Sequence, residues 1–308
     1  MDISSIISLL QTSVELGLVS SLTVLALFLS YTMLNVCDLS TDGCFTLGAA
    51  VGAVVALSGH PFLSIPAAML AGVISGFVTG ILQTKMGIDS LLSGIIVNTA
   101  LYSINIAIMG NSSLINLNKT ETVFTMLKSA LAGSPAEGMY KIIIAFFAVA
   151  ATVIFLSLFL STRLGLAIRA TGNNPDMVRS SSINPVFTTL VGLCVANAFT
   201  GLSGCMLGQL QKSVNIDIGT GMVTMALASL LIGRAFLGRG RVPVRAVGAV
   251  LGAIIFRIVY AVALRFNMPA FMLKLVSSVI VIIAISGPYI KSRIPVIRRR
   301  LSARKGRA

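Results

Sequence analysis

Acidic residues beside apolar segments are the first candidates for function in this chain, which has nine Asp and Glu residues among 308. Asp38, Thr41 and Asp42 lie directly before an apolar stretch. A carboxylate at membrane depth costs ~2.5–3.5 kcal/mol on insertion scales, so it normally faces a polar cavity or a partner. These residues therefore line a path for a polar solute, or else Asp42 or Ser40 caps the following helix. The two roles are compatible, because an interrupted helix needs its end satisfied wherever it lies.

Asp217, Asn98 and Asn197 are further candidates for such a path, and each has a structural alternative. Asp217 precedes another apolar stretch, where it would cap a helix in the same way. Asn98 and Asn197 lie inside apolar segments, where an amide side chain commonly makes an interhelical hydrogen bond. Arg257 also lies inside an apolar segment, with Ala253 one turn earlier leaving room for its stem. We expect Arg257 either to extend toward the membrane interface or to pair with an acidic group.

The sequence contains no recognisable catalytic or metal-binding set. The single histidine, His60, cannot form a metal cluster alone, and the four cysteines lack C-x-x-C spacing. No Ser-His-Asp set and no phosphate-binding loop occurs in the sequence. The sequence therefore predicts a protein that is not an enzyme and binds no metal, and an intramembrane enzyme is the weakest alternative.

Composition determines the fold class. An ordinary soluble domain carries about 25% charged residues, whereas this chain carries 10%, with 56% hydrophobic residues and a mean hydropathy of +0.97. Such a chain cannot cover its surface with polar groups, which excludes a water-soluble enzyme of this length. The 28 glycines suit helices that pack closely in lipid. We predict an all-α polytopic membrane protein, with residues 1–308 forming a single transmembrane domain.

Apolar segments long enough to cross a membrane predict about nine spans, because a helix needs ~20 apolar residues to cross the hydrocarbon. The predicted spans are 14–36, 43–58, 63–82, 91–110, 141–162, 186–210, 218–236, 246–264 and 269–290. Residues 3–13 are a candidate for a separate amphipathic or half-inserted helix, so the count lies between eight and ten. The second and seventh spans are short and follow Asp-containing segments. Paired interrupted helices in oppositely oriented halves indicate a transporter pathway and an inverted repeat.

The distribution of basic residues predicts the orientation. With the N-terminus outside and the C-terminus in the cytoplasm, sixteen of the 23 Lys and Arg residues are cytoplasmic and five are outside. The positive-inside rule favours this arrangement. Eight of the sixteen lie in a basic cytoplasmic tail, residues 291–308. A basic tail behind a hydrophobic span is typical of an orientation signal that attracts anionic lipid, rather than of a nucleic-acid site.

The connection 162–185 is the most informative loop, and the charge distribution makes it cytoplasmic. Gly172 can take a positive φ and end one helix. Asn174 is then the N-cap of the next helix and Pro175 its first residue, followed by an Asp that is a favourable anion in the first turn. We predict a short helix over 175–183 along the membrane face. This helix either docks a soluble partner or rests on lipid as a connector.

Two stretches of this sequence resemble a known family. Arg169-Ala-Thr-Gly-Asn-Asn-Pro175, with Ser182-Ile-Asn184 before the next span, resembles the cytoplasmic loop of ABC importer permeases of the branched-chain amino-acid and ribose type. The early stretch Cys37-Asp-Leu-Ser-Thr-Asp-Gly-Cys-Phe-Thr-Leu-Gly-Ala-Ala-Val is similar to the second-span region of a subgroup linked to tryptophan or tyrosine uptake. Span order and length extend the resemblance over nearly the whole chain.

The resemblance implies a set of partners. These are a second permease copy, expected to form a homodimer around a central path, two cytoplasmic ATPase subunits, an extracytoplasmic substrate-binding protein and the lipid of a prokaryotic plasma membrane. ATP and Mg²⁺ would bind to the ATPase, so this chain would hold no cofactor and no nucleic acid. The family's coupling helix corresponds here to about Asn173–Asn184. The residues expected to contact the ATPase are Arg169, Ala170, Thr171, Gly172, Asn173, Asn174, Pro175, Asp176, Ile183 and Asn184.

These observations predict the permease subunit of an ATP-driven importer for an aromatic or related amino acid. A permease for a sugar or nucleoside is one alternative, because the substrates of the resembled family include both. An ion-coupled secondary transporter is another, and it requires ionisable groups deep in the spans. The groups that come near this requirement, without forming an obvious relay, are Glu15, Asp38, Asp42, Arg257 and Lys274.

Overall fold

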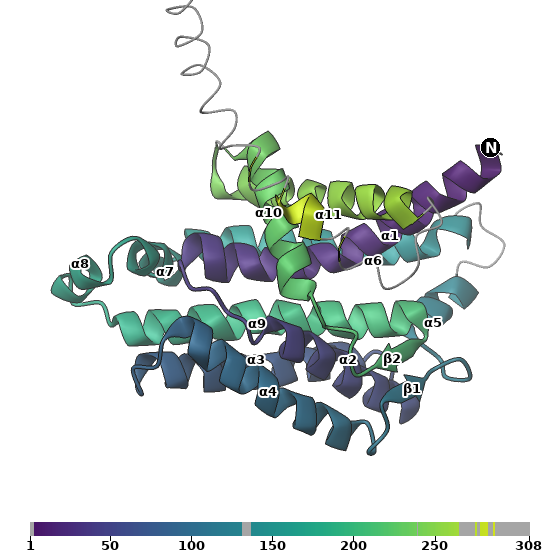
Figure 1. Ribbon diagram of the computed structural model, residues 1–308, viewed down its shortest axis with the longest axis horizontal. Helices are drawn as coiled ribbons and strands as arrows, with labels where there is room; N and C mark the ends of the chain where they lie inside the picture. The colour runs from purple at the N-terminus through teal and green to yellow at the C-terminus, as the bar shows by residue number, and fades with distance from the viewer. Residues whose placement is uncertain are drawn as a thin grey trace, which may run out of the picture.

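The computed structural model describes residues 3–130, 137–238 and 240–264, together with 275, 278–282 and 286. These residues form a bundle of long helices with one two-stranded sheet (Figure 1). Within the described part, six helices are long and apolar enough to cross a membrane, and two further apolar helices are shorter. The predicted all-α polytopic membrane fold is confirmed.

Eight of the predicted spans coincide with helices. These helices are α1 (Ile3–Leu27), α2 (Thr41–Leu57), α3 (Ser64–Thr84), α4 (Ser90–Ile108), α6 (Tyr140–Ser161), α9 (Pro185–Gln211), α10 (Met222–Leu237) and α11 (Val242–Leu264). Residues 3–13 are the start of α1 and not a separate helix. As predicted, α2 and α10 are the short ones. The ninth predicted span lies largely outside the described residues, and Lys274 and the tail 291–308 lie wholly outside them.

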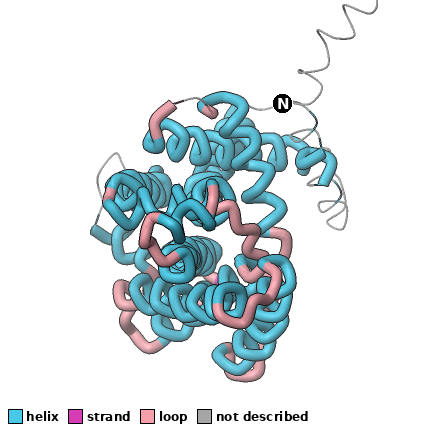
Figure 2. Tube along the Cα trace, turned by 90° about the vertical axis from the view of Figure 1, so that its left-hand side faces the viewer, coloured by secondary structure: helices cyan, strands magenta, loops and turns pink. Residues whose placement is uncertain are grey.

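Glycines allow the central helices to approach one another closely. Seen along the bundle, most helices run side by side through the molecule (Figure 2). A Cβ atom at Gly48 of α2 would lie 2.2 Å from the carbonyl oxygen of Gly201 in α9, and one at Gly72 of α3 would lie 2.2 Å from that of Asn197. Only glycine fits at such crossings, as in other packed membrane helices. The result is a core built from α1, α2 and α9.

Helices from the first half of the chain pack against helices from the second half in matching pairs. Helix α3 packs along α9, and α11 packs along α1; likewise α2 packs on α3, and α10 packs on α11. Helix α1 leads through a π-helix, η1 (Phe28–Met33), to the end of the bundle where α9 begins, so α1 and α9 run in opposite directions (Figure 1). This is the arrangement that the predicted inverted repeat requires.

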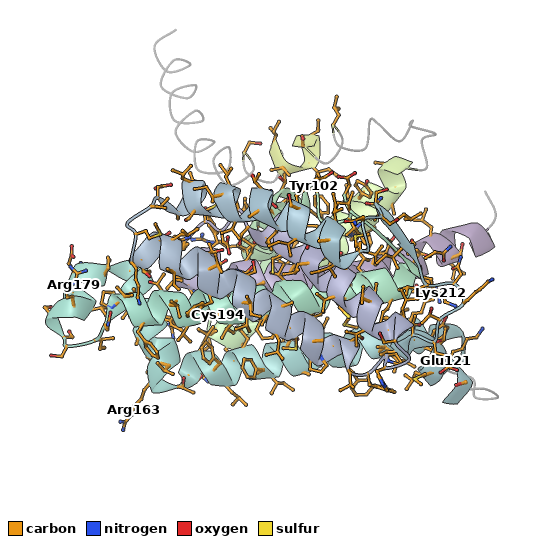
Figure 3. The ribbon with its side chains drawn as sticks, turned by 90° about the horizontal axis from the view of Figure 1, so that it is seen from below. Tyr102, Glu121, Arg163, Arg179, Cys194 and Lys212 are labelled. Atoms are coloured by element: carbon orange, nitrogen blue, oxygen red, sulfur yellow. The ribbon has the colours of Figure 1, made fainter. Side chains whose placement is uncertain are left out.

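Short elements cover the two ends of the bundle. At one end, β1 (Leu114–Asn116) pairs antiparallel with β2 (Ser213–Asn215), beside α5 (Val123–Ala130). The one-turn 3₁₀ helix η2 (Glu137–Met139) precedes α6. At the other end lie α7 (Arg163–Asn173) and α8 (Pro175–Ser180). Figure 3 shows Arg163 and Arg179 at the α8 end, and Glu121 and Lys212 at the opposite end.

Candidate functional site

The break between η1 and α2 is held by a buried polar network around Asp38. The chain turns at Asn35, which has a left-handed φ of 58°. One carboxylate oxygen of Asp38 accepts a hydrogen bond from the backbone N–H of Ser40 at 2.8 Å, and the other accepts one from Asn197 Nδ2 at 2.8 Å. The Thr41 hydroxyl donates to the Asp38 carbonyl oxygen at 2.9 Å. Asp38 is 1% exposed, so Asp38, Thr41 and Asn197 together fasten the broken segment to α9.

Asp42 caps a helix, but a different one from the helix that the sequence predicted. Its two carboxylate oxygens accept hydrogen bonds from the backbone N–H groups of Gly221 and Val223, at 2.9 and 2.8 Å. Both donors belong to the start of α10, where unpaired N–H groups and the helix dipole favour an anion. The prediction that Ser40 or Asp42 caps the helix that follows them, α2, is therefore wrong. Ser40 occupies the N-cap position of α2 without a capping side-chain hydrogen bond.

The predicted cap at Asp217 is also wrong, because Asp42 performs that role. Helix α10 begins at Met222, several residues after Asp217, and its N-cap Gly221 has a φ of 85°. The backbone N–H of Asp217 donates to Asn215 Oδ1 at 2.6 Å, and its carbonyl oxygen accepts from Thr220. The Asp217 side chain is exposed.

Three of the predicted path residues meet in one polar cavity, which we call the Asp42 cavity. Asp42, Asn98 and Asp217 line this space of about 400 Å³ between α2, α4 and the loop before α10. Its other polar lining side chains are Thr46, Thr99, Tyr102, Ser103, Asn105 and Thr220. Because Thr99, Tyr102 and Ser103 are exposed, the cavity opens on the outer face of α4. Its two carboxylates and its amide and hydroxyl groups offer sites for a polar, hydrogen-bonding solute.

Sequence reasoning identified Asn98 but missed Thr99, Tyr102 and Ser103, the other α4 residues at the opening of this cavity, although a signal was present. Asn98, Thr99, Tyr102 and Ser103 follow the spacing of one helix face, because residues three and four apart are neighbours on a helix. Asn105, one turn later than Tyr102, makes the interhelical hydrogen bond that its position in a span predicts. Its Nδ2 donates to the carbonyl oxygen of Gly43 in α2 at 3.1 Å.

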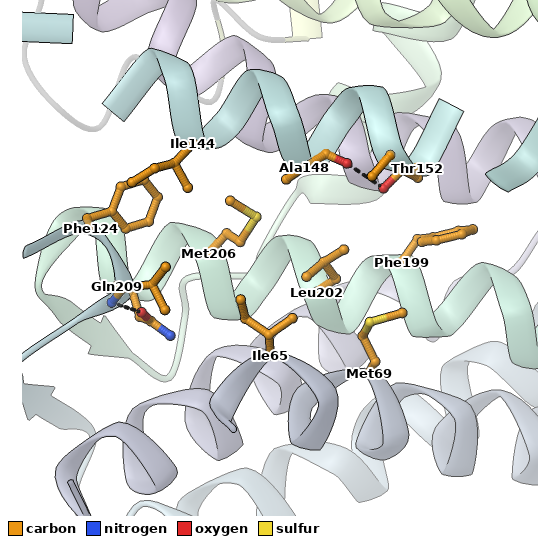
Figure 4. Close-up of a pocket in the computed structure, with 12 residues that line it drawn as sticks. Ile65, Met69, Phe124, Ile144, Ala148, Thr152, Phe199, Leu202, Met206 and Gln209 are labelled. Atoms are coloured by element: carbon orange, nitrogen blue, oxygen red, sulfur yellow. Dashed lines mark hydrogen bonds between the residues drawn. The ribbon is translucent and has the colours of Figure 1, made fainter. Parts of the chain in front are cut away.

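A second cavity, of about 350 Å³, is apolar and does not suit a polar solute. It lies between α3, α5, α6 and α9, with Met69, Phe124 and Leu202 among its lining residues (Figure 4). The polar side chain of Gln209 is engaged at its edge. Gln209 Oε1 accepts from the backbone N–H of Val123 at 3.0 Å, and Nε2 donates to the Ser64 hydroxyl at 2.6 Å.

The predicted helix in the connection 162–185 is present. Asn174 Oδ1 accepts from the backbone N–H groups of Asp176 and Met177, at 3.1 and 3.0 Å, and Pro175 is the first residue of α8. The cap and the helix start are therefore confirmed. Helix α8 ends at Ser180 rather than at 183, because Ser182 takes a left-handed φ of 60°.

The predicted role of Gly172 is wrong. Gly172 lies inside α7 and is not among the glycines with positive φ. A Cβ at Gly172 would lie 2.2 Å from the carbonyl oxygen of Met33, so the position requires glycine because α7 touches the end of η1. A hydrogen bond of 2.8 Å between the Thr171 and Thr188 hydroxyls joins α7 to α9. The connection is thus attached rigidly to two long helices.

The residues expected to contact an ATPase divide into a buried base and an exposed tip. Within α7, Thr171 is buried, and Arg169, Ala170 and Gly172 are half-buried. The exposed predicted residues are Asn173, Asn174, Pro175, Asp176, Ile183 and Asn184. Asn184 has a further role, because its Oδ1 accepts from the N–H of Val186 and caps α9. In α8, Val178 is 1% exposed and Met177 is 55% exposed, so the helix presents one apolar side chain outward.

Comparison with known sequences adds independent information. Residues 9–285 match the family described as the permease component of branched-chain amino acid transport systems. The chain is 31% identical over 280 residues to the tyrosine transport system permease protein of Clostridioides difficile, covering 91% of this chain and 90% of that protein. It is 25% identical over 224 residues to the ribose import permease protein of Escherichia coli, covering 71% of this chain and 66% of that protein. No solved structure matches the chain.

Proposed function

This chain belongs to the permease family of branched-chain amino acid transport systems, and we propose that it imports an aromatic or related amino acid with energy from partner ATPases. It is an ABC-type permease, a multi-pass protein of the plasma membrane and a transporter subunit rather than an enzyme. ATP and Mg²⁺ would bind in the ATPase subunits, and an extracytoplasmic binding protein would deliver the solute.

The choice of an aromatic amino acid rests on one observation, the likeness to a tyrosine permease over nine-tenths of both chains. A sugar or nucleoside is the second candidate. Supporting it are the ribose permease and a nucleoside permease of Lactococcus lactis, which is 29% identical over 52% of this chain and 48% of that protein. A thermal-shift screen of the cognate binding protein against amino acids, sugars and nucleosides tests the choice. Stabilisation by a sugar or nucleoside alone would overturn the amino-acid assignment.

The Asp42 cavity is our candidate for part of the path. It joins two carboxylates with amide and hydroxyl groups at the start of a short helix, and it opens on the exposed face of α4. A second copy of the chain packed on α4, in a homodimer, would close that opening and enclose the path. Cross-linking through a cysteine at exposed Leu92 tests this arrangement, and a cysteine at exposed Phe147 on α6 is the control. Cross-linking through position 147 but not through position 92 would contradict it.

Helix α8 is our candidate for the contact with the ATPase. Helix α8 is exposed and is capped by Asn174. The preceding helix, α7, contacts both α9 and η1, so a displacement of α8 would be transmitted to the core of the bundle. In proteoliposomes with the ATPase and the binding protein, Met177→Glu should reduce ATP-dependent uptake at least about tenfold, because a charge replaces an exposed apolar contact. Lys85→Glu, in an exposed connection at the same end, is the control. Normal coupled uptake by Met177→Glu would exclude α8 as the docking site.

The proposed orientation has α8 and the C-terminus in the cytoplasm and the N-terminus outside. The described connections at the α8 end carry Lys85, Arg163, Arg179 and Arg241, as the positive-inside rule favours. Membrane-impermeant labelling of a cysteine at exposed Ser180 should fail in intact cells and succeed in inverted vesicles. Labelling from outside would overturn the docking role as well. Uptake that continues without ATP and stops when the ion gradient is dissipated would favour a secondary transporter instead.

A further inference from the structure

Arg257 places a charged group inside the helix bundle. Its Nε and Nη2 both donate to the Ser20 hydroxyl oxygen in α1, at 3.1 and 2.8 Å. Among the described residues, Lys141 and Glu15 form an ion pair, and no ion pair includes Arg257. No Asp or Glu follows Asp217 in the sequence, so no side chain of residues 218–308 can supply a carboxylate. The expectation that Arg257 pairs with an acidic group is therefore wrong for the described part of the chain.

One hydroxyl group cannot accept all the hydrogen bonds that the Arg257 side chain is able to donate. A guanidinium has five N–H donors in a planar fork and no acceptor. Ser20 accepts from two of its nitrogens, and the Ser20 hydroxyl itself donates to the carbonyl oxygen of Leu16 at 2.6 Å. An ionisable group within a membrane span is costly and normally has a counter-charge or a function. Ser20 supplies no counter-charge.

The Arg257 side chain borders a cavity of about 440 Å³, which we call the Arg257 cavity. This volume lies in the range of small-molecule sites, ~300–1,000 Å³. Gln211, Thr220 and Thr224 contribute polar groups to its wall, and Met222, Phe256 and Tyr260 contribute apolar surface. The rings of Phe256 and Tyr260 are stacked, with centroids 6.4 Å apart. Arg257 is only half-buried because of this open space beside it.

We propose that the Arg257 cavity binds an oxyanion, a carboxylate or a phosphate, that is carried on an apolar or aromatic body. The planar fork of Arg257 matches two oxygens of such a group, which would supply the counter-charge that the described residues do not. The aromatic and methionine side chains accommodate the body of the ligand. Two sources carry this chemistry, a small carboxylate solute and the phosphate of a lipid. The inference rests on Arg257 and its cavity and does not depend on the proposed function.

The test measures binding to the full-length chain, purified and delipidated in detergent, with two matched probe pairs. L-tyrosine is compared with tyramine, which lacks the carboxylate, and phosphatidylglycerol is compared with diacylglycerol, which lacks the phosphate. We expect the oxyanion member of at least one pair to bind and its counterpart to bind more weakly. A preference for tyrosine identifies a solute carboxylate, and a preference for phosphatidylglycerol identifies a lipid phosphate. No preference in either pair overturns the proposal.

Substitutions of Arg257 test whether this residue is responsible for the preference for the oxyanion probe. Arg257→Gln should weaken binding of the preferred oxyanion by about ten- to a hundredfold, because it removes charge-assisted hydrogen bonds. Arg257→Lys keeps the charge without the planar fork, so it should weaken binding less and remains informative if the Gln variant does not fold. Arg241→Gln removes the same charge from an exposed position before α11 and should leave binding unchanged. Equal binding by wild type, Arg257→Gln and Arg257→Lys would overturn the proposal. Because no ATPase takes part, failure of coupled uptake would not affect this result.

Discussion

Two cavities of similar size flank the loop 216–221, and their charged groups are satisfied in different ways. In the Asp42 cavity, the carboxylate accepts hydrogen bonds from two backbone N–H groups at the start of α10. In the Arg257 cavity, the guanidinium has a single neutral hydroxyl as its partner among the described residues. Thr220 lines both spaces, so this loop is the wall between them.

The difference shows that the partners of a charged residue, rather than its position in a span, decide its role. The Asp42 carboxylate accepts hydrogen bonds from the unpaired N–H groups at the start of α10, so its main contribution is to the stability of the fold. Arg257 has more donors than Ser20, its partner among the described residues, can use, and the proposed ligand would accept hydrogen bonds from the others. The following substitutions test this contrast.

Asp42→Ala should have the largest effect. Removing the carboxylate leaves two N–H groups of α10 without their partner and should lower the free energy of unfolding by about 2–3 kcal/mol. Denaturant titration in mixed micelles measures this loss. Asp42→Asn keeps one oxygen acceptor and should lose about half as much. An Asp42→Ala protein as stable as wild type would contradict the capping role.

Gly219→Ala should have the next largest effect, because it disturbs the same contact from the opposite side. A Cβ at Gly219 would lie 2.0 Å from the carbonyl oxygen of Asp42, so the loop must move away from α2. Overpacking of this kind costs about 1–3 kcal/mol, measured by the same titration. Gly138→Ala, where a Cβ would have no neighbour within 4 Å, is the control. An equal effect at both positions would show that the loop is not held against α2.

Arg257→Met should change stability by no more than about 1 kcal/mol, and the variant could be more stable than wild type. An apolar side chain of similar size replaces a charge that has no counter-charge among the described residues. The Ser20 hydroxyl keeps its hydrogen bond to Leu16. A loss as large as that of Asp42→Ala would mean that Arg257 is chiefly a structural link between α1 and α11, and the contrast between the cavities would disappear.

Asp217→Asn should have the smallest effect on stability, below about 0.5 kcal/mol, because the side chain is exposed and does not cap α10. Asp217 lines the same cavity as Asp42, so comparing substitutions at the two positions distinguishes a structural role from a role in the path. Uptake reduced in Asp217→Asn with unchanged stability would support the path. Destabilisation comparable to that of Asp42→Ala would restore the capping role that the sequence suggested.

Features that depend on neighbours in the sequence were predicted well. The apolar segments located eight helices because span length follows from the thickness of the hydrocarbon. Asn174 and Pro175 identified the start of α8 because an N-cap side chain bonds to N–H groups two and three residues later. The short α2 and α10 followed from the polar segments before them.

Features that depend on distant residues were not predictable in this way. Gly172 is required by contact with Met33, which is far away in the sequence. Asp42 caps α10, although its own helix was the nearer candidate. Asp38 bonds to Asn197, a pairing that its local sequence does not indicate.

The sequence by itself determined that this chain crosses a membrane as helices, where eight of its apolar helices lie, and that α8 begins at Pro175. Hydrophobic length and helix capping act over a few residues, so they can be read along the chain. Only the tertiary structure decided which helix Asp42 caps, which loop separates the two cavities, and that Arg257 has a hydroxyl and no carboxylate as its partner among the described residues. Those outcomes depend on helices from the two halves packing together, because a hydrogen bond or a close contact requires two groups to meet in space.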